Sequence, residues 1–181
     1  MAGISHDLYD GNLLDTSEVG TFAGLAAIRR HLFQDVYEFA GTKRTVNIAK
    51  SNFRFVPVMY LDAALDAIDK MPQSTFDQIV EKYVEMSIAH PFREGNGRST
   101  RIWLDQIFRT EIGDVVDWSL VDKEDYLFAM ERSPVRGSEI KTLLSKALTT
   151  ATVDRQVYMK GIDASYGYEG YSTYTMDVLA G

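Results

Sequence analysis

The chain has no cysteine among its 181 residues and only three histidines. Without cysteine, disulfides and thiolate-ligated metal sites are excluded. The histidines, His6, His31 and His90, include no pair with the spacing of a helical zinc site, so a metal-dependent hydrolase ranks only third among the functions considered. A reducing compartment is compatible with this composition.

Long apolar segments are also missing. No run of about 18 apolar residues occurs, so no membrane-spanning helix and no membrane partner are expected. The first seven residues show no basic segment followed by an apolar one, so we expect no signal peptide. These absences predict a cytoplasmic protein.

Basic residues are outnumbered by acidic ones, 19 to 26, which gives a net charge of -7 at pH 7 and a pI near 4.9. A surface of that sign repels a phosphate backbone, so we expect no direct binding to nucleic acid. A local basic cluster can still bind a small anion, and residues 90–101 contain one.

Apolar residues recur at three- and four-residue steps through most of the chain, as in amphipathic helices. The hydrophobic content of 45% is sufficient for one compact core. Residues 45–60 are instead rich in β-branched and aromatic side chains and contain Pro57, which predicts a short hairpin. We predict an all-α fold with at most two strands and about seven helices, at 21–40 (stopped by Gly41), 61–71, 74–90, 97–107, 123–132, 138–148 and 152–164.

Twelve residues connect the predicted helix at 74–90 to the next one. They are His90-Pro91-Phe92-Arg93-Glu94-Gly95-Asn96-Gly97-Arg98-Ser99-Thr100-Arg101. The first helix must end near His90, because Pro91 disfavours the α conformation in the residue before it. Gly95 and Gly97 allow a tight turn before the new helix, whose first N–H groups face that turn and form an anion-binding nest.

The charged side chains of this stretch suit a magnesium-bound polyphosphate. Arg98 and Arg101 share one face of the first helical turn, where positive charge is unfavourable unless an anion binds. Glu94 supplies one carboxylate, which is enough for Mg²⁺ when phosphates provide other ligands. His90, with an ordinary pKa of roughly 6.5, can act as a base toward a hydroxyl group. Phe92 is expected to anchor the loop in the core.

Each part of the stretch also has a purely structural interpretation. A histidine before a proline is often a surface or capping residue, and Gly95-Asn96-Gly97 can be a simple turn. A nucleotide P-loop is excluded, because the Gly-Lys-[Ser/Thr] core is missing and a helix precedes the turn. The presence of a base, a carboxylate, a nest and two arginines within twelve residues favours a function.

The stretch resembles the signature of the Fic family, His-x-Phe-x-[Asp/Glu]-Gly-Asn-Gly-Arg-x-x-Arg, at every defined position. Residues 36–41, followed by Arg44, are similar to the family's N-terminal core, and the hairpin falls where the family has a target-docking flap. The resemblance covers roughly residues 18–171. It implies a flexible lead-in at 1–17, a Fic catalytic core at 18–150, a C-terminal inhibitory helix region at 151–175 and a tail at 176–181, as in the short bacterial subclass.

This resemblance implies transfer of AMP from MgATP to a Tyr, Thr or Ser hydroxyl of a target protein. His90 would deprotonate the hydroxyl and Glu94 would hold Mg²⁺. The nucleotide site would comprise Gly95, Asn96, Gly97, Arg98, Ser99, Thr100 and Arg101, with the first three around the α-phosphate and the arginines on the β- and γ-phosphates. Doc-like kinases depart from the second glycine of the motif, so Gly97 favours AMP transfer. Transfer of phosphocholine stays open.

The predicted flap supplies a second group of candidate residues, Lys50, Ser51, Asn52, Phe53, Arg54 and Phe55. The flap would hold an extended target segment by strand addition, which depends on backbone more than on side chains. Lys50 could also reach a phosphate or the base, or be an ordinary exposed lysine. Ser87, one helical turn before His90, could contact the ribose or base, or simply pack in the core.

Near the C-terminus, Ser165, Glu169 and Gly170 resemble the family's inhibitory motif, [Ser/Thr]-x-x-x-Glu-[Gly/Asn]. The resemblance implies that Glu169 pairs with Arg101 in the place of the γ-phosphate, shifting ATP binding by about 1–3 kcal/mol. A tyrosine-rich tail with one solvated glutamate is the alternative. Tyr166 and Tyr168 are candidate sites of self-modification, because a tethered hydroxyl has a high effective concentration.

Two other functions stay open. One is a catalytically idle module that senses nucleotide and binds a partner, although it would not need His90, Glu94 and Arg101 together. The other is a Fic enzyme that transfers a different phosphate-containing group. The protein target cannot be deduced from the residues. A type II topoisomerase subunit is a candidate by analogy with short bacterial relatives, and a homo-oligomer that shields the tail would be a natural regulator.

Overall fold

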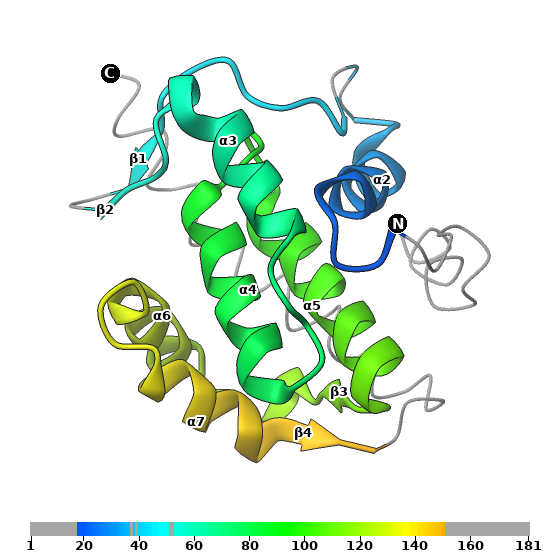
Figure 1. The fold of residues 1–181 in the computed structure, drawn as a ribbon, viewed down its shortest axis with the longest axis vertical. Coiled ribbons are helices and arrows are strands. Elements are labelled where there is room, and N and C mark those ends of the chain that lie inside the picture. The colour runs from blue at the N-terminus through cyan, green and yellow to red at the C-terminus, as the bar shows by residue number, and fades with distance from the viewer. Residues whose placement is uncertain (1–17, 37, 39, 51–52, 151–181) are drawn as a thin grey trace.

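The computed structural model describes residues 18–36, 38, 40–50 and 53–150. Helices α4 (Phe76–Ala89) and α5 (Asn96–Ile112) run side by side through its centre and are joined by the turn within residues 90–95 (Figure 1). Helix α2 (Phe22–Phe33) packs on α5, and α3 (Val58–Asp69) packs on α4 and α2. The predicted all-α fold with a small hairpin is confirmed.

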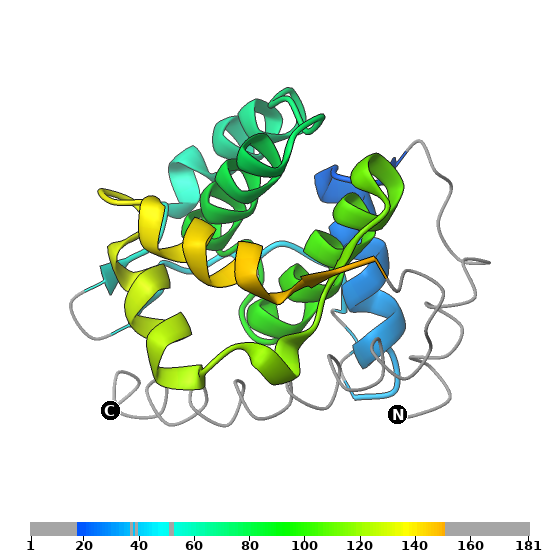
Figure 2. The same ribbon diagram turned by 90° about the horizontal axis from the view of Figure 1, so that it is seen from below.

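The second half of the described chain covers the other side of the central pair (Figure 2). It comprises β3 (Val115–Val116), a 3-10 helix η2 (Trp118–Leu120), α6 (Lys123–Arg132), α7 (Ser138–Ala147) and β4 (Leu148–Thr149). Helix α7 packs on α4, α6 and η2, and β3 packs on α5. Strands β3 and β4 pair antiparallel, with Val115 opposite Thr149 and Val116 opposite Leu148.

Helix α5 forms the centre of the hydrophobic core. The side chains of Trp103, Leu104, Ile107 and Phe108 have no exposed surface. Neighbours on three sides explain why polar residues of the first turn of α5 are also buried. A helix held in this way is a rigid support for whatever its N-terminus binds.

Local sequence accounts for both ends of the central helices. At the start of α4, Thr75 and Gln78 form a reciprocal capping box. The helix ends where His90 adopts a left-handed conformation (φ 47°, ψ 62°) before Pro91. Helix α5 starts after Gly95, also left-handed, and stops at Gly113. Of the predicted bounds of this helix pair, the end near His90 and the start near Gly97 are confirmed to within one residue, whereas α4 starts two residues later than predicted and α5 extends five residues further.

The predicted helix at 21–40 is too long. Helix α2 ends at Phe33, and Val36, which the periodic pattern placed in the core, is 56% exposed. After the helix the chain approaches α2 again at Gly41, where a Cβ would lie 2.9 Å from the carbonyl oxygen of Ala26. This close approach and the φ of 83° both favour glycine at that position. The helical spacing of apolar residues in the sequence thus extends past Phe33, where the helix itself ends.

The hairpin at 45–60 is confirmed, but its paired part is short. Strands β1 (Ala49–Lys50) and β2 (Phe53–Arg54) are antiparallel, with Lys50 opposite Phe53. The following helix begins at Val58, three residues before the predicted start at 61. The N–H of Val58 donates to the side chain of Asn47 at 2.9 Å, a cap supplied from eleven residues earlier.

The expectation of at most two strands is wrong, because β3 and β4 form a second pair. Two-residue strands are too short for an alternating pattern to reveal them. The helices predicted at 123–132 and 138–148 are confirmed as α6 and α7, whereas the helix at 152–164 lies outside the described residues. Among the helices that the structure describes, none is both long and apolar enough to cross a membrane.

Candidate active site

The turn between α4 and α5 is held together by its own residues. The Asn96 side chain accepts from the N–H of Phe92 at 2.9 Å and donates to its carbonyl at 2.6 Å. Phe92 is fully buried and lies 5.9 Å from the ring of Phe22, which confirms its expected packing role. The Asn96 side chain therefore closes the turn with one accepted and one donated hydrogen bond.

The N-terminus of α5 is built for a close approach of backbone to an anion. Gly95 precedes the helix without a side-chain cap, and its φ of 72° is unfavourable for other residues. A Cβ at Gly95 would lie 2.7 Å from the ring of Phe33, and one at Gly97 would lie 3.0 Å from Nη1 of Arg101. The first N–H groups of a helix have no acceptor within the helix and carry its positive dipole end, so they favour an anion here.

Two buried arginines flank this helix start. Arg98 and Arg101 are almost fully buried, and the guanidinium carbon of Arg98 lies 5.2 Å from the centre of the Phe33 ring. Arg101 lies against Gly97 and acts electrostatically on Lys50, Tyr83 and Asp105. Two cations at the positive end of a helix dipole repel one another and the dipole, and a bound polyphosphate relieves that repulsion.

The flap covers the imidazole of His90. Phe55, directly after β2, stacks on the His90 ring with centroids 3.8 Å apart and an angle of 12° between the planes. Burial lowers the pKa of His90 to about 3, and the positive charges of Arg44 and Lys50 add to the effect. The imidazole is therefore neutral at pH 7.

The low pKa of His90 predicts how the stability of the folded chain depends on pH. The unfolded chain, with a pKa near 6.5, binds this proton before the folded chain does. The contribution of His90 to stability is therefore present above pH 6.5 and is lost as the pH falls toward 3. In a proton NMR titration of the folded protein, the His90 ring resonance is expected to keep its neutral position down to roughly pH 4. A midpoint near 6.5 would contradict the burial described here.

Lys50 lies in the same electrostatic environment, which favours a role at the site over an ordinary exposed lysine. It is half-buried in β1 and acts electrostatically on His90. Burial lowers the pKa of Lys50, Glu131 of α6 raises it, and Arg101 lowers it. Glu131 was not predicted as a site residue, and no motif in the sequence marks it.

Residues 21–108 match the model of the Fic/DOC family. These residues form a Fic/DOC domain. The chain is 33% identical over 142 residues to protein adenylyltransferase VbhT of Bartonella schoenbuchensis and 34% identical over 124 residues to the probable protein adenylyltransferase y4lH of Sinorhizobium fredii. The matches cover 72% and 62% of this chain, but only 30% of VbhT and 64% of y4lH.

Solved structures show the same fold. The N-terminal Fic domain of a Bartonella quintana effector, solved with bound ADP, superposes with a TM-score of 0.69 at 18% identity, covering 88% of this chain and 86% of that one. BepC of Bartonella tribocorum, solved with bound AMPPNP, superposes with a TM-score of 0.66 at 17% identity, covering 82% and 85%. The Fic fold is thus shared well beyond the matched family segment.

Three hydroxyl groups that were predicted to contact the nucleotide donate hydrogen bonds to backbone carbonyls of the chain. Ser87 Oγ donates to the carbonyl of Tyr83 and Ser99 Oγ to that of Gly95, each at 2.9 Å, and Thr100 Oγ1 donates to the carbonyl of Asn96. Ser99 and Thr100 are also buried. These bonds stabilise the two helices, and the assignment of the three hydroxyls to the nucleotide stays a prediction.

Several predicted residues lie outside the described part of the chain. They are Ser51 and Asn52 of the flap, and Ser165, Tyr166, Tyr168, Glu169 and Gly170 of the C-terminal motif. Of the remaining flap residues, Phe53 pairs with Lys50, Arg54 is exposed and Phe55 is half-buried on His90. The division into domains at 17, 150 and 175 also stays a prediction.

Two buried arginines that the sequence did not single out support the Fic turn. Arg29 of α2 donates from Nε to the carbonyl of Glu94 at 2.8 Å and stacks between Phe33 and Phe92, at 5.0 and 4.8 Å from their ring centres. Arg44, which the sequence indicated only through the family resemblance, contacts both the end of α4 and the flap. No motif spacing links either arginine to the turn, because the contacts are tertiary.

The donors around the turn fit magnesium only as part of a nucleotide complex. Within residues 18–36, 38, 40–50 and 53–150, no three His, Asp or Glu side chains come together to hold a metal ion. Glu94 is a single, half-buried carboxylate next to the nest. Mg²⁺ commonly keeps one protein carboxylate with phosphates and water as its other ligands, so Glu94 fits this role.

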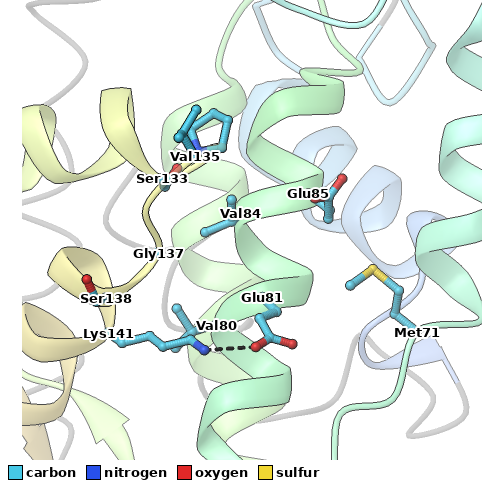
Figure 3. Close-up of a pocket in the computed structure, with 11 residues that line it drawn as sticks. Met71, Val80, Glu81, Val84, Glu85, Ser133, Val135, Gly137, Ser138 and Lys141 are labelled. Atoms are coloured by element: carbon cyan, nitrogen blue, oxygen red, sulfur yellow. Dashed lines mark hydrogen bonds and ion pairs between the residues drawn. The ribbon is translucent and has the colours of Figure 1, made fainter.

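A groove of about 490 Å³ lies elsewhere, between α4 and the connection from α6 to α7 (Figure 3). Val80 and Val84 face it from α4, and Lys141 donates to Glu81 at 2.8 Å on its rim. None of the predicted site residues lines this groove. The candidate active site is therefore the turn and its flap.

Proposed function

We propose that this Fic domain transfers AMP from MgATP to a hydroxyl side chain of a target protein. The observation that carries the proposal is the turn from His90 to Arg101, which has the complete Fic signature and joins a histidine-terminated helix to an anion-binding helix start. The similarity to the protein adenylyltransferase VbhT and the probable protein adenylyltransferase y4lH supports the same activity.

In the proposed reaction, neutral His90 takes the proton of the target hydroxyl. The oxygen attacks the α-phosphorus of ATP, a new phosphorus–oxygen bond forms, and the bond to the β-phosphate oxygen breaks. Pyrophosphate leaves with the electron pair of that bond, and AMP stays on the target as a phosphodiester. Because Phe55 stacks on the imidazole, the incoming side chain must reach the ring edge or displace Phe55.

The remaining residues stabilise charge. The N–H groups at the start of α5 would face the α-phosphate, where negative charge develops during the attack. Arg98 and Arg101 would hold the β- and γ-phosphates through paired hydrogen bonds. Glu94 would hold Mg²⁺, which supplies charge neutralisation between the α- and β-phosphates when bound.

Labelled ATP tests this function directly. With ATP labelled at the α-phosphate, adding the protein to a lysate should attach label covalently to other proteins above the level in the lysate alone, whereas ATP labelled at the γ-phosphate should give no increase over that level. Label from the γ-phosphate would indicate a kinase, and binding of ATP without label transfer would indicate the idle nucleotide-sensing module. Identifying the labelled protein would test the type II topoisomerase analogy.

We further propose that Glu169 inhibits this site from the C-terminal segment. A carboxylate that competes with the γ-phosphate for Arg101 should reduce transfer about ten- to a hundredfold. Glu169→Gly is therefore expected to raise AMP incorporation by that factor, measured with α-labelled ATP, while Glu18→Gly should not. Equal rates for the wild type and Glu169→Gly would refute the lock.

Self-modification is proposed for Tyr166 and Tyr168, next to Glu169 in the sequence. A peptide map of the active chain should show AMP on one of the two tyrosines, and the modified chain should transfer faster. An unmodified tail in a chain that modifies its target would exclude this mechanism of release.

A further inference from the structure

Arg44 makes an unusual set of contacts for a residue outside the signature. It is buried, and its guanidinium donates to four backbone carbonyls. Nε donates to His90 at 2.7 Å, Nη1 to Val46 at 2.9 Å, and Nη2 to Ala89 at 3.1 Å and to Val56. All four acceptors lie either at the end of α4 or at the base of the flap.

The contacts at α4 explain how His90 is held. The last carbonyls of a helix receive no hydrogen bond from an N–H of the same helix. A cation placed near them also interacts favourably with the helix dipole. His90 is the only described non-glycine residue with a positive φ, a conformation that persists only where its surroundings enforce it. Arg44 binds the carbonyls on both sides of that bend, and its own N–H donates to the carbonyl of Pro91 at 2.8 Å.

The contacts at Val46 and Val56 fix the two ends of the flap. The N–H of Val56 also donates to the carbonyl of Ile88 at 3.2 Å, so the chain leaving the flap is attached to α4 directly by this bond and indirectly through Arg44. Phe55, which stacks on the His90 ring, directly precedes Val56. The Arg44 guanidinium therefore contacts the backbone next to Phe55 as well as the backbone of His90.

We infer that Arg44 is the positioning residue that sets the orientation of the His90 imidazole and fixes the flap over it. This inference rests on the proposed function, in which His90 is the base. A lysine could not replace Arg44, because an ammonium is a single point charge on a flexible stem, whereas the guanidinium donates along several fixed directions at once. Misplacing a catalytic group by about 1 Å can cost a hundredfold in rate.

The test compares Arg44→Lys with Lys82→Met. Lys82 is the matched control, because it is also buried on the α4 side of the core and also donates to a loop carbonyl, that of Met71 at 3.2 Å, away from the turn. Arg44→Lys is expected to lower the turnover of AMP transfer at least tenfold, roughly the cost of a misplaced base. Its MgATP affinity in calorimetry should stay within about threefold of the wild type, because no phosphate ligand changes. Lys82→Met should lower the melting temperature without lowering the turnover of the folded fraction.

A second readout does not depend on activity. Stacking on Phe55 shifts the proton resonances of the His90 ring, and Arg44→Lys should move them toward those of an unstacked histidine, whereas Lys82→Met should leave them in place. Wild-type turnover and an unmoved His90 resonance in a folded Arg44→Lys protein would overturn the inference. A chain in which wild type and Glu169→Gly both fail to transfer AMP would refute the proposed function instead, and the resonance would still test Arg44.

If Arg44→Lys does not fold, hydrogen exchange of the wild type provides the decision. The N–H groups of Arg44, Val56 and His90 all donate within this connection, to Pro91, Ile88 and Met86. Because one guanidinium ties these segments together, the three amides should exchange with similar protection factors. Exchange of the Val56 amide more than about a hundredfold faster than that of His90 would show a flap that opens independently, contrary to the inference.

Discussion

Replacing His90 by alanine is expected to lower AMP transfer by about 10²- to 10⁴-fold, the usual contribution of a positioned general base. In the proposed mechanism the half-buried, neutral imidazole accepts the proton of the target hydroxyl, and without it that proton must go to water. Transfer should be measured with ATP labelled at the α-phosphate. The binding of MgATP should change little, because the phosphate ligands lie on α5 and not at His90.

The control for this experiment is His31→Ala. His31 is a half-buried helical histidine in α2, away from the α4–α5 turn, so its loss should leave the rate within about twofold. A His90→Ala protein that transfers AMP at the wild-type rate would show that His90 is not the general base. Loss of both transfer and MgATP binding would instead indicate a collapsed turn.

The second large effect is expected at Asp105, one helical turn after Arg101. Its carboxylate accepts from the N–H of Val116 and from the indole N–H of Trp118, each at 2.9 Å. Asp105→Asn places an amide N–H₂ against one of these two donors. At pH 5, where the Asp105 carboxyl is protonated in the folded wild type, the free energy of unfolding is expected to fall by about 1–3 kcal/mol.

The effect of Asp105 should also depend on pH, with a sign opposite to that of His90. Burial raises the pKa of Asp105 from 3.8 to about 7, against the hydrogen bonds from Val116 and Trp118 and the charges of Arg109 and Arg101, which lower it. The folded chain therefore holds this proton longer than the unfolded chain. The resulting stability is present below pH 3.8 and is lost as the pH rises through 7, by an amount on the order of 4 kcal/mol.

Urea denaturation of wild type and Asp105→Asn between pH 4 and 8 separates the two titrations. His90 is present in both chains, so the difference between their unfolding free energies isolates Asp105. We expect the disadvantage of Asp105→Asn to shrink steadily as the pH rises. A difference that stays constant with pH would show that Asp105 titrates normally in the folded protein. Asp117→Asn, at a nearby half-buried position whose carboxylate also accepts from a backbone N–H, that of Ser119, is the matched control for replacing one hydrogen-bonded carboxylate.

The proposed chemistry was predictable from the sequence because its determinants are local. Pro91 ends α4, Gly95 permits the left-handed turn, and Asn96 closes it by bonding Phe92, all within a few residues. Capping and turn preferences act over this range, so the order of residues is sufficient to place a base before the nest and arginines after it. Strands β3 and β4 and the true end of α2 were missed because the contacts that define them are tertiary.

What the amino-acid order determined by itself is the family, the helical pattern and the twelve-residue turn with its base, carboxylate and arginines. Only the tertiary structure decided that Phe55 covers His90, that Lys50 shares its electrostatic environment with Glu131, and that Arg44, 46 residues before His90, holds the base and the flap together. Periodicity and motif spacing report which residues follow one another, whereas burial and the direction of a guanidinium depend on which segments meet in the folded chain.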